Sequence, residues 1–363
     1  MKFRNLFNSK CKGCLFLIIF LSLFFTATSF VDCNQVYAKD KVYEWKFFSA
    51  YGPGDSACCD VWPALFEKVK RATNGRLDIS VFWSGQHPYQ GSDMLKVIRD
   101  GSAELAHFYG GFLASVEPVF GIDAIPMLFP SDADESFALV SKLWGDFKLD
   151  RKGVLERVLE DKWGGCMIHA LPASQQRIYT SGYKINGIGS LKGHKVRVYS
   201  PELATLVTIL GGTPVSIAFA ELYTGLSTGL VDGLVTSVYF ANAGGFFDFC
   251  DTINLWEIMA AADELMVSKK ALDKLPPDIR KTFLDIMYKS VTKPERAELE
   301  TNALVLEELI KKGIQVYVPS QKEREAVIKR CQKEIWAPWV VRAGADAKLA
   351  LEQVEEVKKT FKK

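Results

Sequence analysis

The sequence predicts an α/β protein with two lobes and a cleft between them. Segments with the two-residue alternation of strands are separated by segments with helical spacing, which indicates βαβ units and a mostly parallel sheet. The pattern occurs twice along the chain. The 363 residues, 48% of them hydrophobic, are enough to give each lobe a core of its own.

The first series of elements extends from residue 42 to about residue 171. Helical spacing over 61–73 ends at Asn74-Gly75, a pair that terminates helices. A proline-bearing section, 117–130, is expected to be irregular. The expected strands are 42–49, 77–83, 103–108 and 165–171, and the expected helices are 61–73, 92–99 and most of 134–159.

The second series begins with the strand 195–199, in which Val196 and Val198 point to one face and Arg197 to the other. Ser200-Pro201, a serine cap before a proline, predicts that a helix starts as this strand ends. The further expected strands are 213–215, 231–237, 265–268 and 315–318, and the expected helices are 201–210, 220–228, a helix after Pro276-Pro277, 294–313 and the C-terminal segment.

Residues 1–38 are predicted to be a cleaved signal peptide. They combine four basic residues near the start, an apolar run over 14–25 and Val36-Tyr37-Ala38 before the expected cleavage point. A membrane anchor is the alternative, but the run is shorter than the ~20 residues a spanning helix needs. Lipidation at Cys33 is a second alternative, and the preceding Asp32 does not suit it. We therefore expect export to the periplasm.

Composition excludes some partners. Without residues 1–38 the chain has 41 basic and 42 acidic side chains, so its formal charge falls from +2 to −1, and no basic surplus indicates nucleic-acid binding. Five cysteines remain, at positions 58, 59, 166, 250 and 331. One disulfide is compatible with this number, but the spacing is not that of a disulfide framework.

No motif predicts catalysis. The four histidines, at positions 87, 107, 169 and 194, form no HExxH pattern and have no metal-ligand spacing with cysteine or carboxylate. A nucleophile elbow, a P-loop and a dinucleotide fingerprint are also missing from the sequence. Two arginines, Arg177 and Arg197, are candidates for binding a carboxylate, because the planar set of donors in a guanidinium matches its two oxygens. The structural alternative for Arg197 is pairing with a surface glutamate or capping a helix.

The stretch Ser190 to Gly233 resembles the signature of the solute-binding proteins of tripartite ATP-independent periplasmic (TRAP) transporters, the DctP-type family. Its elements are a Leu-Lys-Gly turn, the strand Lys-Val-Arg, Gly-Gly-Thr-Pro-Val, Ala-Phe-Ala-Glu-Leu-Tyr and a closing Gly-Leu-Val-Asp-Gly. The similarity extends upstream to Val97-Ile98-Arg99-Asp100-Gly101 and Ile125-Pro126-Met127-Leu128, and downstream to Leu272-Asp273-Lys274-Leu275.

The resemblance implies a two-lobed periplasmic binding protein fold with a long helix spanning both lobes. It implies a lobe I of residues 39–174 plus 263–302 and a lobe II of residues 175–262 plus 303–363. In this family the strand arginine binds the ligand's carboxylate, and here it is Arg197. The ligand-binding residues that the resemblance implies or permits are Arg197, Arg177, Phe219, Thr236, Tyr51, Tyr109, His107 and Tyr239.

After the Val-Asp-Gly close, many family members have an asparagine, or a Glu-Trp pair in some binders of 2-oxo acids. This chain has Leu234-Val235-Thr236 instead, so we expect neither a bound metal nor a cofactor. Tyr51, Phe108, Tyr109, Phe219 and Tyr239, if they converge, predict a pocket for a carboxylate with an apolar or aromatic body.

The implied function is capture of an organic acid by cleft closure and its delivery to membrane permease subunits, by a monomer or by a dimer. A ligand-sensing subunit of a signalling receptor is the main alternative. A secreted enzyme acting on an organic acid is a third.

Overall fold

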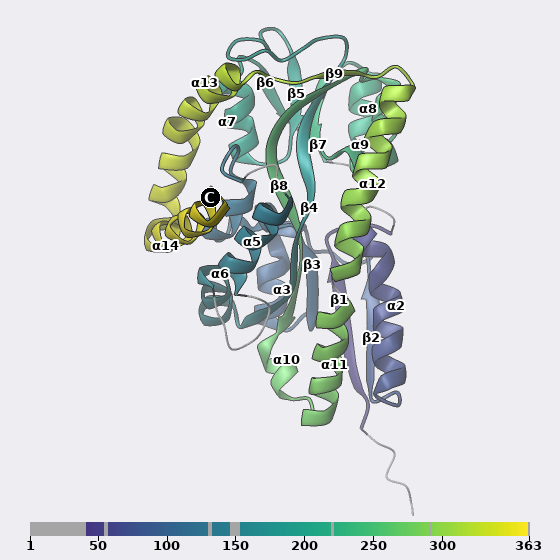
Figure 1. Ribbon diagram of the computed structural model, residues 1–363. Helices are drawn as coiled ribbons and strands as arrows, with labels where there is room; N and C mark the ends of the chain where they lie inside the picture. The colour runs from purple at the N-terminus through teal and green to yellow at the C-terminus, as the bar shows by residue number, and fades with distance from the viewer. Residues whose placement is uncertain are drawn as a thin grey trace, which may run out of the picture. The chain divides into compact units, whose positions relative to one another are not determined.

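In the described part of the chain, a mixed β-sheet of nine strands has the order β2-β1-β3-β8-β4-β7-β5-β6, with β9 beside β8 (Figure 1). The computed structural model describes residues 41–53, 57–129, 133–145, 153–218, 221–290 and 292–361. The strands are β1 (Tyr43–Ser49), β2 (Leu77–Phe82), β3 (Leu105–Phe108), β4 (Gly165–Thr180), β5 (Lys195–Val198), β6 (Thr213–Ser216), β7 (Gly233–Thr236), β8 (Thr252–Ser268) and β9 (Gln315–Tyr317).

Two parallel groups of strands lie at the two sides of this sheet. In the first strand group, β1 pairs in parallel with β2 and β3. In the second strand group, β5 pairs in parallel with β6 and β7. The antiparallel strands β4 and β8 join the groups, because β8 pairs with β3 and β4 pairs with β7. The predicted α/β class is therefore confirmed.

The joining strands are much longer than the sequence predicts. β4 has 16 residues and β8 has 17, against the expected 165–171 and 265–268. Their pairing shifts register at three places, between Met167 and His169, Pro172 and Ser174, and Gln176 and Ile178. Such irregularities bend a strand and admit residues that a regular ladder excludes. Pro172 and the polar residues after it therefore suggest a loop in the sequence but lie within a strand.

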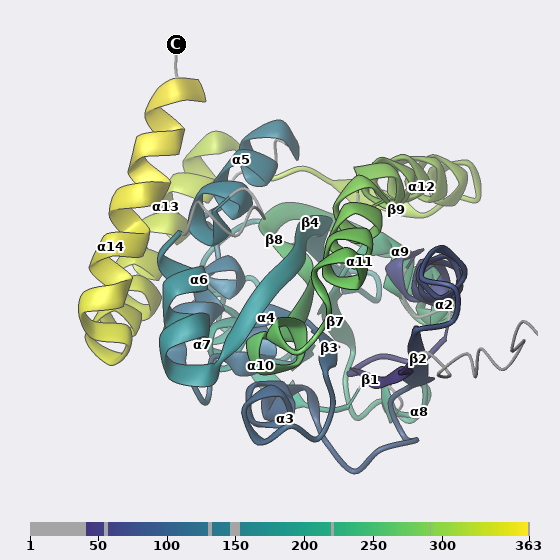
Figure 2. The ribbon, with the colours of Figure 1, turned by 90° about the horizontal axis from the view of Figure 1, so that it is seen from below.

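Helices cover both faces of the sheet (Figures 1 and 2). One face carries helices that share a single hydrophobic cluster: α3 (Met94–Asp100), α5 (Ala133–Trp144), α6 (Val154–Val158), α7 (Pro201–Ile209), α13 (Gln321–Cys331) and α14 (Ala337–Phe361). The other face carries α2 (Ala57–Ala72) and α11 (Pro277–Ser290) over the first strand group, and α8 (Leu222–Ser227), α9 (Val238–Ala243) and α12 (Thr292–Lys311) over the second. Two shorter helices are α4 (Gly110–Leu113) and α10 (Lys269–Asp273).

The long helix α12 contacts both regions, since it packs against α2 on the first strand group and against α9 on the second (Figure 1). This is the helix expected over 294–313. The expected helical segment 134–159 is divided into α5 and α6, and α6 continues into a π-helical turn at Leu159–Trp163.

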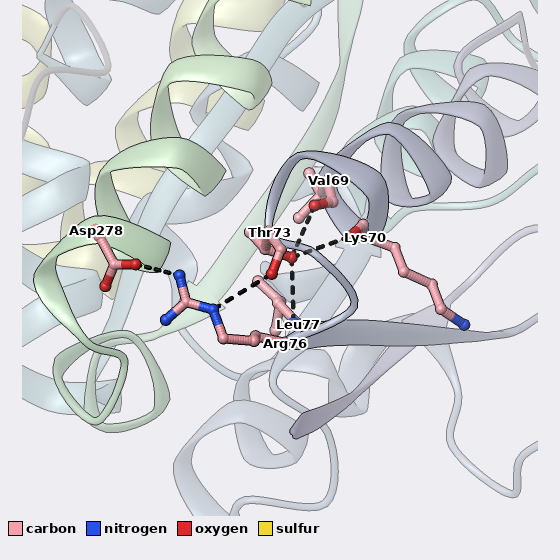
Figure 3. Close-up of polar contacts among 6 residues, drawn as sticks. All are labelled: Val69, Lys70, Thr73, Arg76, Leu77 and Asp278. Atoms are coloured by element: carbon pink, nitrogen blue, oxygen red, sulfur yellow. Dashed lines mark hydrogen bonds and ion pairs between the residues drawn. The ribbon is translucent and has the colours of Figure 1, made fainter. Parts of the chain in front are cut away.

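The end of α2 shows how the first strand group is tied to the helices outside it (Figure 3). Thr73 Oγ1 donates to the carbonyl of Val69 at 2.9 Å and accepts from the amide of Leu77 at 3.2 Å, so one hydroxyl joins the helix end to the start of β2. Arg76 donates to the carbonyl of Thr73 and forms an ion pair with Asp278 on α11. Asn74 and Gly75 have positive φ angles, which give the tight turn between α2 and β2. The sequence predicts this helix end.

Some predictions fall outside the described residues. The proposed signal peptide, residues 1–38, is one of them, and of the separate unit Met1–Lys41 only Lys41 is described. Phe219 is another. In the part of the chain that the structure describes, no helix is both long and apolar enough to cross a membrane. Cys59, Cys166, Cys250 and Cys331 are buried.

Candidate functional site

The carboxyl ends of the two strand groups face each other. Beyond the end of β1, the ring of Tyr51 lies 6.4 Å from that of Phe240 on α9. Beyond the end of β3, the ring of Tyr109 lies 6.1 Å from that of Tyr199, which follows β5. In α/β sheets, ligands bind outside the carboxyl ends of parallel strands. These two cross-contacts therefore locate the candidate site between the groups.

Arg197 is a buried cation on the second strand group. Its side chain is 5% exposed, and Nε and Nη1 donate to the carbonyls of Ile217 and Val235 at 3.1 and 3.3 Å. Within the described residues no carboxylate lies within ion-pair distance of it. Burial lowers its pKa to about 10, so the group stays charged at neutral pH. Among the described residues, two of its five N–H donors have an acceptor, which leaves three for a ligand.

The face of this guanidinium rests on an aromatic ring. The central carbon of Arg197 lies 5.0 Å from the ring centroid of Tyr199, within the range of a cation–π interaction. The hydroxyl of Tyr199 donates to Oε1 of Gln176 at 2.9 Å, which fixes the ring in place. Burial raises the pKa of Tyr199, so the phenol stays neutral. Neither the neutral phenol of Tyr199 nor the side-chain amide of Gln176 is negatively charged, so neither compensates the positive charge of Arg197.

Arg177 and Thr236 lie on the same face of the sheet as Arg197. Arg177 on β4 is directly opposite Thr236 on β7, and Arg197 on β5 is opposite Leu234, two residues before Thr236. Opposite residues of paired strands share a face, and so do residues two apart. The Nε of Arg177 is buried without a hydrogen-bond partner among the described residues. Three neighbouring strands thus present two arginines with a threonine between them.

A row of aromatic rings begins at Phe240 on α9, passes through three rings beside the first strand group and ends at Tyr199 next to Arg197. Ring centroids are 6.4 Å apart for Phe240 and Tyr51, 6.1 Å for Tyr51 and Phe112, 5.4 Å for Phe112 and Tyr109, and 6.1 Å for Tyr109 and Tyr199. Burial is the main cause that raises the pKa of Tyr51 and of Tyr109. The row is therefore neutral, and it offers ring surfaces and hydroxyl groups.

Other predicted site residues lie differently. His107 is fully buried, with both ring nitrogens occupied by protein groups. Phe108 is fully buried and points to the face of β3 opposite to that of His107. The backbone amide of Tyr239 donates to Asn302 at 3.1 Å, and its ring lies 6.0 Å from that of Phe240. Tyr239 thus lies at the end of the aromatic row, next to α12.

Sequence reasoning missed several residues of the site: Gln176, Tyr199, Phe112 and Phe240. Tyr199 could have been found, because it follows Arg197 by two residues and so shares its face. Gln176 neighbours Arg177 in a segment that was not expected to be strand. Phe112 and Phe240 lie on the short helices α4 and α9, for which the sequence shows too few turns to reveal a period.

Histidine and carboxylate side chains do meet in the fold. His107 Nε2 lies 2.5 Å from Asp263 Oδ1 and its Nδ1 lies 3.0 Å from Ser49 Oγ, and His194 lies 2.9 Å from Asp232. Sequence spacing gave no sign of these pairs, because Asp263 is 156 residues from His107. Among the described residues no three His, Cys, Asp or Glu side chains are grouped so as to hold a metal ion.

The chain is similar to known solute-binding proteins. The "2,3-diketo-L-gulonate-binding periplasmic protein YiaO" of Escherichia coli K12 is 21% identical over 268 residues, which cover 72% of this chain and 77% of that protein. The structure of DctP6, an extracytoplasmic solute receptor of Bordetella pertussis binding pyroglutamic acid, has a TM-score of 0.75 and 20% identity, covering 86% of this chain and 100% of that one. A TRAP periplasmic solute-binding protein of Desulfovibrio salexigens, with bound orotic acid, has a TM-score of 0.74 and 24% identity, covering 87% and 98%.

These structural similarities confirm the two-lobed periplasmic binding protein fold. Residues 61–339 match the DctP family, described as "Bacterial extracellular solute-binding protein, family 7". This range includes Arg177, Thr236 and Arg197. The resemblance found in the stretch from Ser190 to Gly233 is thereby confirmed, and the chain belongs to the DctP family of bacterial extracellular solute-binding proteins.

Proposed function

We propose that this protein is the periplasmic receptor of a TRAP transporter, which captures a small organic acid and delivers it to the membrane permease subunits. The observation that carries the proposal is the buried guanidinium of Arg197, which has no anionic partner in the described part of the chain. An unpaired buried charge is costly. A ligand carboxylate removes that cost when it occupies the three free donors.

Capture proceeds by closure of the two strand groups on the ligand. The bent strands β4 and β8 connect the groups, and the contacts of Tyr51 with Phe240 and of Tyr109 with Tyr199 cross between them. A ligand shifts a conformational equilibrium only through its different affinities for the two states. Contacts that exist only in the closed state are thus what the acid selects, and the permease recognises that state.

The ligands of similar proteins support a carboxylic acid. Pyroglutamic acid, orotic acid and 2,3-diketo-L-gulonate appear in the names of three of them, and each is a carboxylic acid with a small polar body. Here the aromatic row beside Arg197 favours an acid whose body is flat or partly apolar. Export through a cleaved signal peptide belongs to the same proposal, since the receptor meets its ligand outside the cytoplasm.

A thermal-shift screen tests the proposal. Purified protein is heated with dicarboxylates, 2-oxo acids, sugar acids, pyroglutamate and orotate, and with the amide of each acid as its matched control. Ligand at a hundred times its dissociation constant stabilises by about 2.7 kcal/mol, which raises the midpoint by a few degrees. We expect a shift with one class of acid and none with its amide. An amide that acts as strongly as its acid would contradict carboxylate capture.

A further inference from the structure

We infer that Asp263 is a positioning residue of the ligand site, which acts through His107 and Ser49 to hold Tyr51 in place. Three hydrogen bonds form this relay. Asp263 Oδ1 lies 2.5 Å from His107 Nε2, His107 Nδ1 lies 3.0 Å from Ser49 Oγ, and Ser49 Oγ accepts from the backbone amide of Tyr51 at 3.1 Å. The inference rests on the proposed function, because it assigns Tyr51 to the site.

We assign the relay the direction that an ionised Asp263 and a neutral His107 give it. An ionised carboxylate only accepts hydrogen bonds, so His107 Nε2 donates to Asp263. In the neutral imidazole Nδ1 is then an acceptor, and it receives the hydroxyl proton of Ser49. The oxygen of Ser49 remains free to accept from the amide of Tyr51. Every group has a partner, and the bonds point the same way, so that each strengthens the next.

Packing prevents the imidazole from turning. The ring of Phe47 stacks on that of His107 at 5.8 Å with an angle of 22°, and Trp62 meets it edge-on at 5.5 Å. On a further side the ring of Tyr51 itself lies 5.2 Å away. Ser49, His107 and Asp263 are each at most 4% exposed. Because the His107 ring cannot turn, a movement of the Asp263 side chain should also move Tyr51.

The relay starts on a strand that joins the two strand groups. Asp263 lies on β8 opposite Leu171, next to the register shift between Pro172 and Ser174 on β4. His107 belongs to β3 and Ser49 ends β1. The hydrogen bonds thus cross from the bent joining strands to the loop after β1. Tyr51 is held in the position where its ring meets Phe240 of the second strand group.

The same three residue types form the catalytic triad of serine hydrolases, but here they lack a nucleophile that a substrate can reach. Ser49 is fully buried. Its oxygen already accepts the amide of Tyr51, which fixes it toward the protein interior. The arrangement therefore positions a loop, and hydrolysis of an activated ester by the wild-type protein at Ser49 would overturn this assignment.

The relay is tested first without any ligand, in wild type and in the variants Asp263→Asn and Ser49→Ala. Nitrogen-15 NMR of labelled histidine should show Nε2 protonated in the wild type. The proton should move toward Nδ1 in Asp263→Asn, because an amide can donate to Nε2. Amide hydrogen exchange at Tyr51 should be faster in both variants. A wild-type His107 protonated at Nδ1 would overturn the relay.

Affinity is then measured by calorimetry with orotate, pyroglutamate and whichever acid gives the largest thermal shift. Ser49→Ala should weaken binding about fivefold, the equivalent of one hydrogen bond. It should weaken binding no further in a protein that already carries Tyr51→Ala. The matched control is Ser268→Ala, which removes a buried cap of α10 at the end of β8 and should lower stability without changing affinity.

The possible failures are distinct. If the wild type binds none of the acids, the proposed function fails and the positioning role fails with it, whatever the NMR result. If the wild type binds an acid but Ser49→Ala and Asp263→Asn bind it equally well, only the positioning role is wrong. If Ser268→Ala weakens binding as much as Ser49→Ala, lost stability explains the effect and the assignment to Tyr51 is also overturned.

Discussion

The two sides of the candidate site bury charges of opposite sign. The buried acids beside the first strand group include Asp123, Asp263 and Glu264, and on the second strand group lies Arg197. Burial raises the pKa of Asp123 to about 7 and raises that of Glu264 well above its usual value. Asp263 has His107 as a partner. Asp123 and Glu264 can thus take up a proton, and Asp263 has a hydrogen-bond donor in His107.

The guanidinium of Arg197 has no such option. Its pKa of about 10 keeps it charged at any physiological pH, and its protein partners are two neutral carbonyls and a neutral ring. A carboxyl group adapts to burial by taking up a proton, whereas a guanidinium must wait for an anion. The difference between the two sides shows where a ligand is needed. Substitutions at three positions can test it.

The largest effect is expected from Arg197→Met. Removing one member of a buried charge pair costs about 2 to 5 kcal/mol of binding free energy, so the dissociation constant should rise by at least thirtyfold. The ligand-free protein should lose little stability, about 1 kcal/mol or less, because the lost hydrogen bonds to two carbonyls are offset by the loss of an unpaired charge. Calorimetric titration and urea unfolding of the ligand-free protein measure the two quantities.

Arg342→Met is the matched control. Arg342 on α14 pairs at 2.7 Å with Glu202, a carboxylate only 4% exposed. Its removal leaves that carboxylate unpaired and should cost about 1 to 2 kcal/mol of stability, with no change in affinity. The two arginines should therefore give opposite results. A large loss of stability in ligand-free Arg197→Met would show that Arg197 is structural.

The second effect is on the pH dependence of stability, and it concerns Asp123. Because burial raises its folded-state pKa from 3.8 to about 7, the folded protein holds this proton more tightly than the unfolded chain. That stabilisation is fully present below pH 4 and is lost as the pH rises toward 7. This loss amounts to up to roughly 4 kcal/mol of unfolding free energy, and Asp123→Asn should abolish it.

Urea unfolding at pH 4.5 and pH 7 measures the difference between the variant and the wild type. The control is the exposed Asp285, whose pKa is lowered by its hydrogen bond with Lys281. Asp285→Asn should leave the change in unfolding free energy between the two pH values nearly unchanged. If the unfolding free energy of Asp123→Asn depends on pH as strongly as that of the wild type, Asp123 is ionised in the folded protein. Asp123 would then add a second buried negative charge to that of Asp263 on this side of the site.

Different parts of this picture could be predicted from the sequence. The face on which Arg197 lies could, because strict alternation in a short strand gives it, whereas its role in ligand binding, which comes from the family resemblance, remains a prediction. The long strands β4 and β8 could not, since buried polar residues such as Asn254, Asp263 and Glu264 break the alternation that reveals a strand. Their pairing also needs irregular register, for which the chain shows no local signal.

Contacts between distant residues were the other limit. His107 lies 58 residues from Ser49 and 156 from Asp263, so the relay exists only once the sheet has formed. Phe219 remains a prediction, because it lies outside the described residues. The lobe boundaries at residues 174, 262 and 302 also remain predictions. β4 and β8 extend through both strand groups, and their pairing shows no point at which one lobe ends.

The smallest effect separates the ring of Tyr199 from its hydroxyl. Tyr199→Phe keeps the ring that lies 5.0 Å from the guanidinium and loses the hydrogen bond to Gln176, so affinity should fall less than fivefold. Tyr199→Leu also removes the cation–π contact, worth about 1 to 2 kcal/mol at a desolvated site, and should weaken binding further. In a protein carrying Arg197→Met the two variants should bind equally. If they already bind equally beside an intact Arg197, the hydroxyl and Gln176 orient the cation, and the ring only fills space.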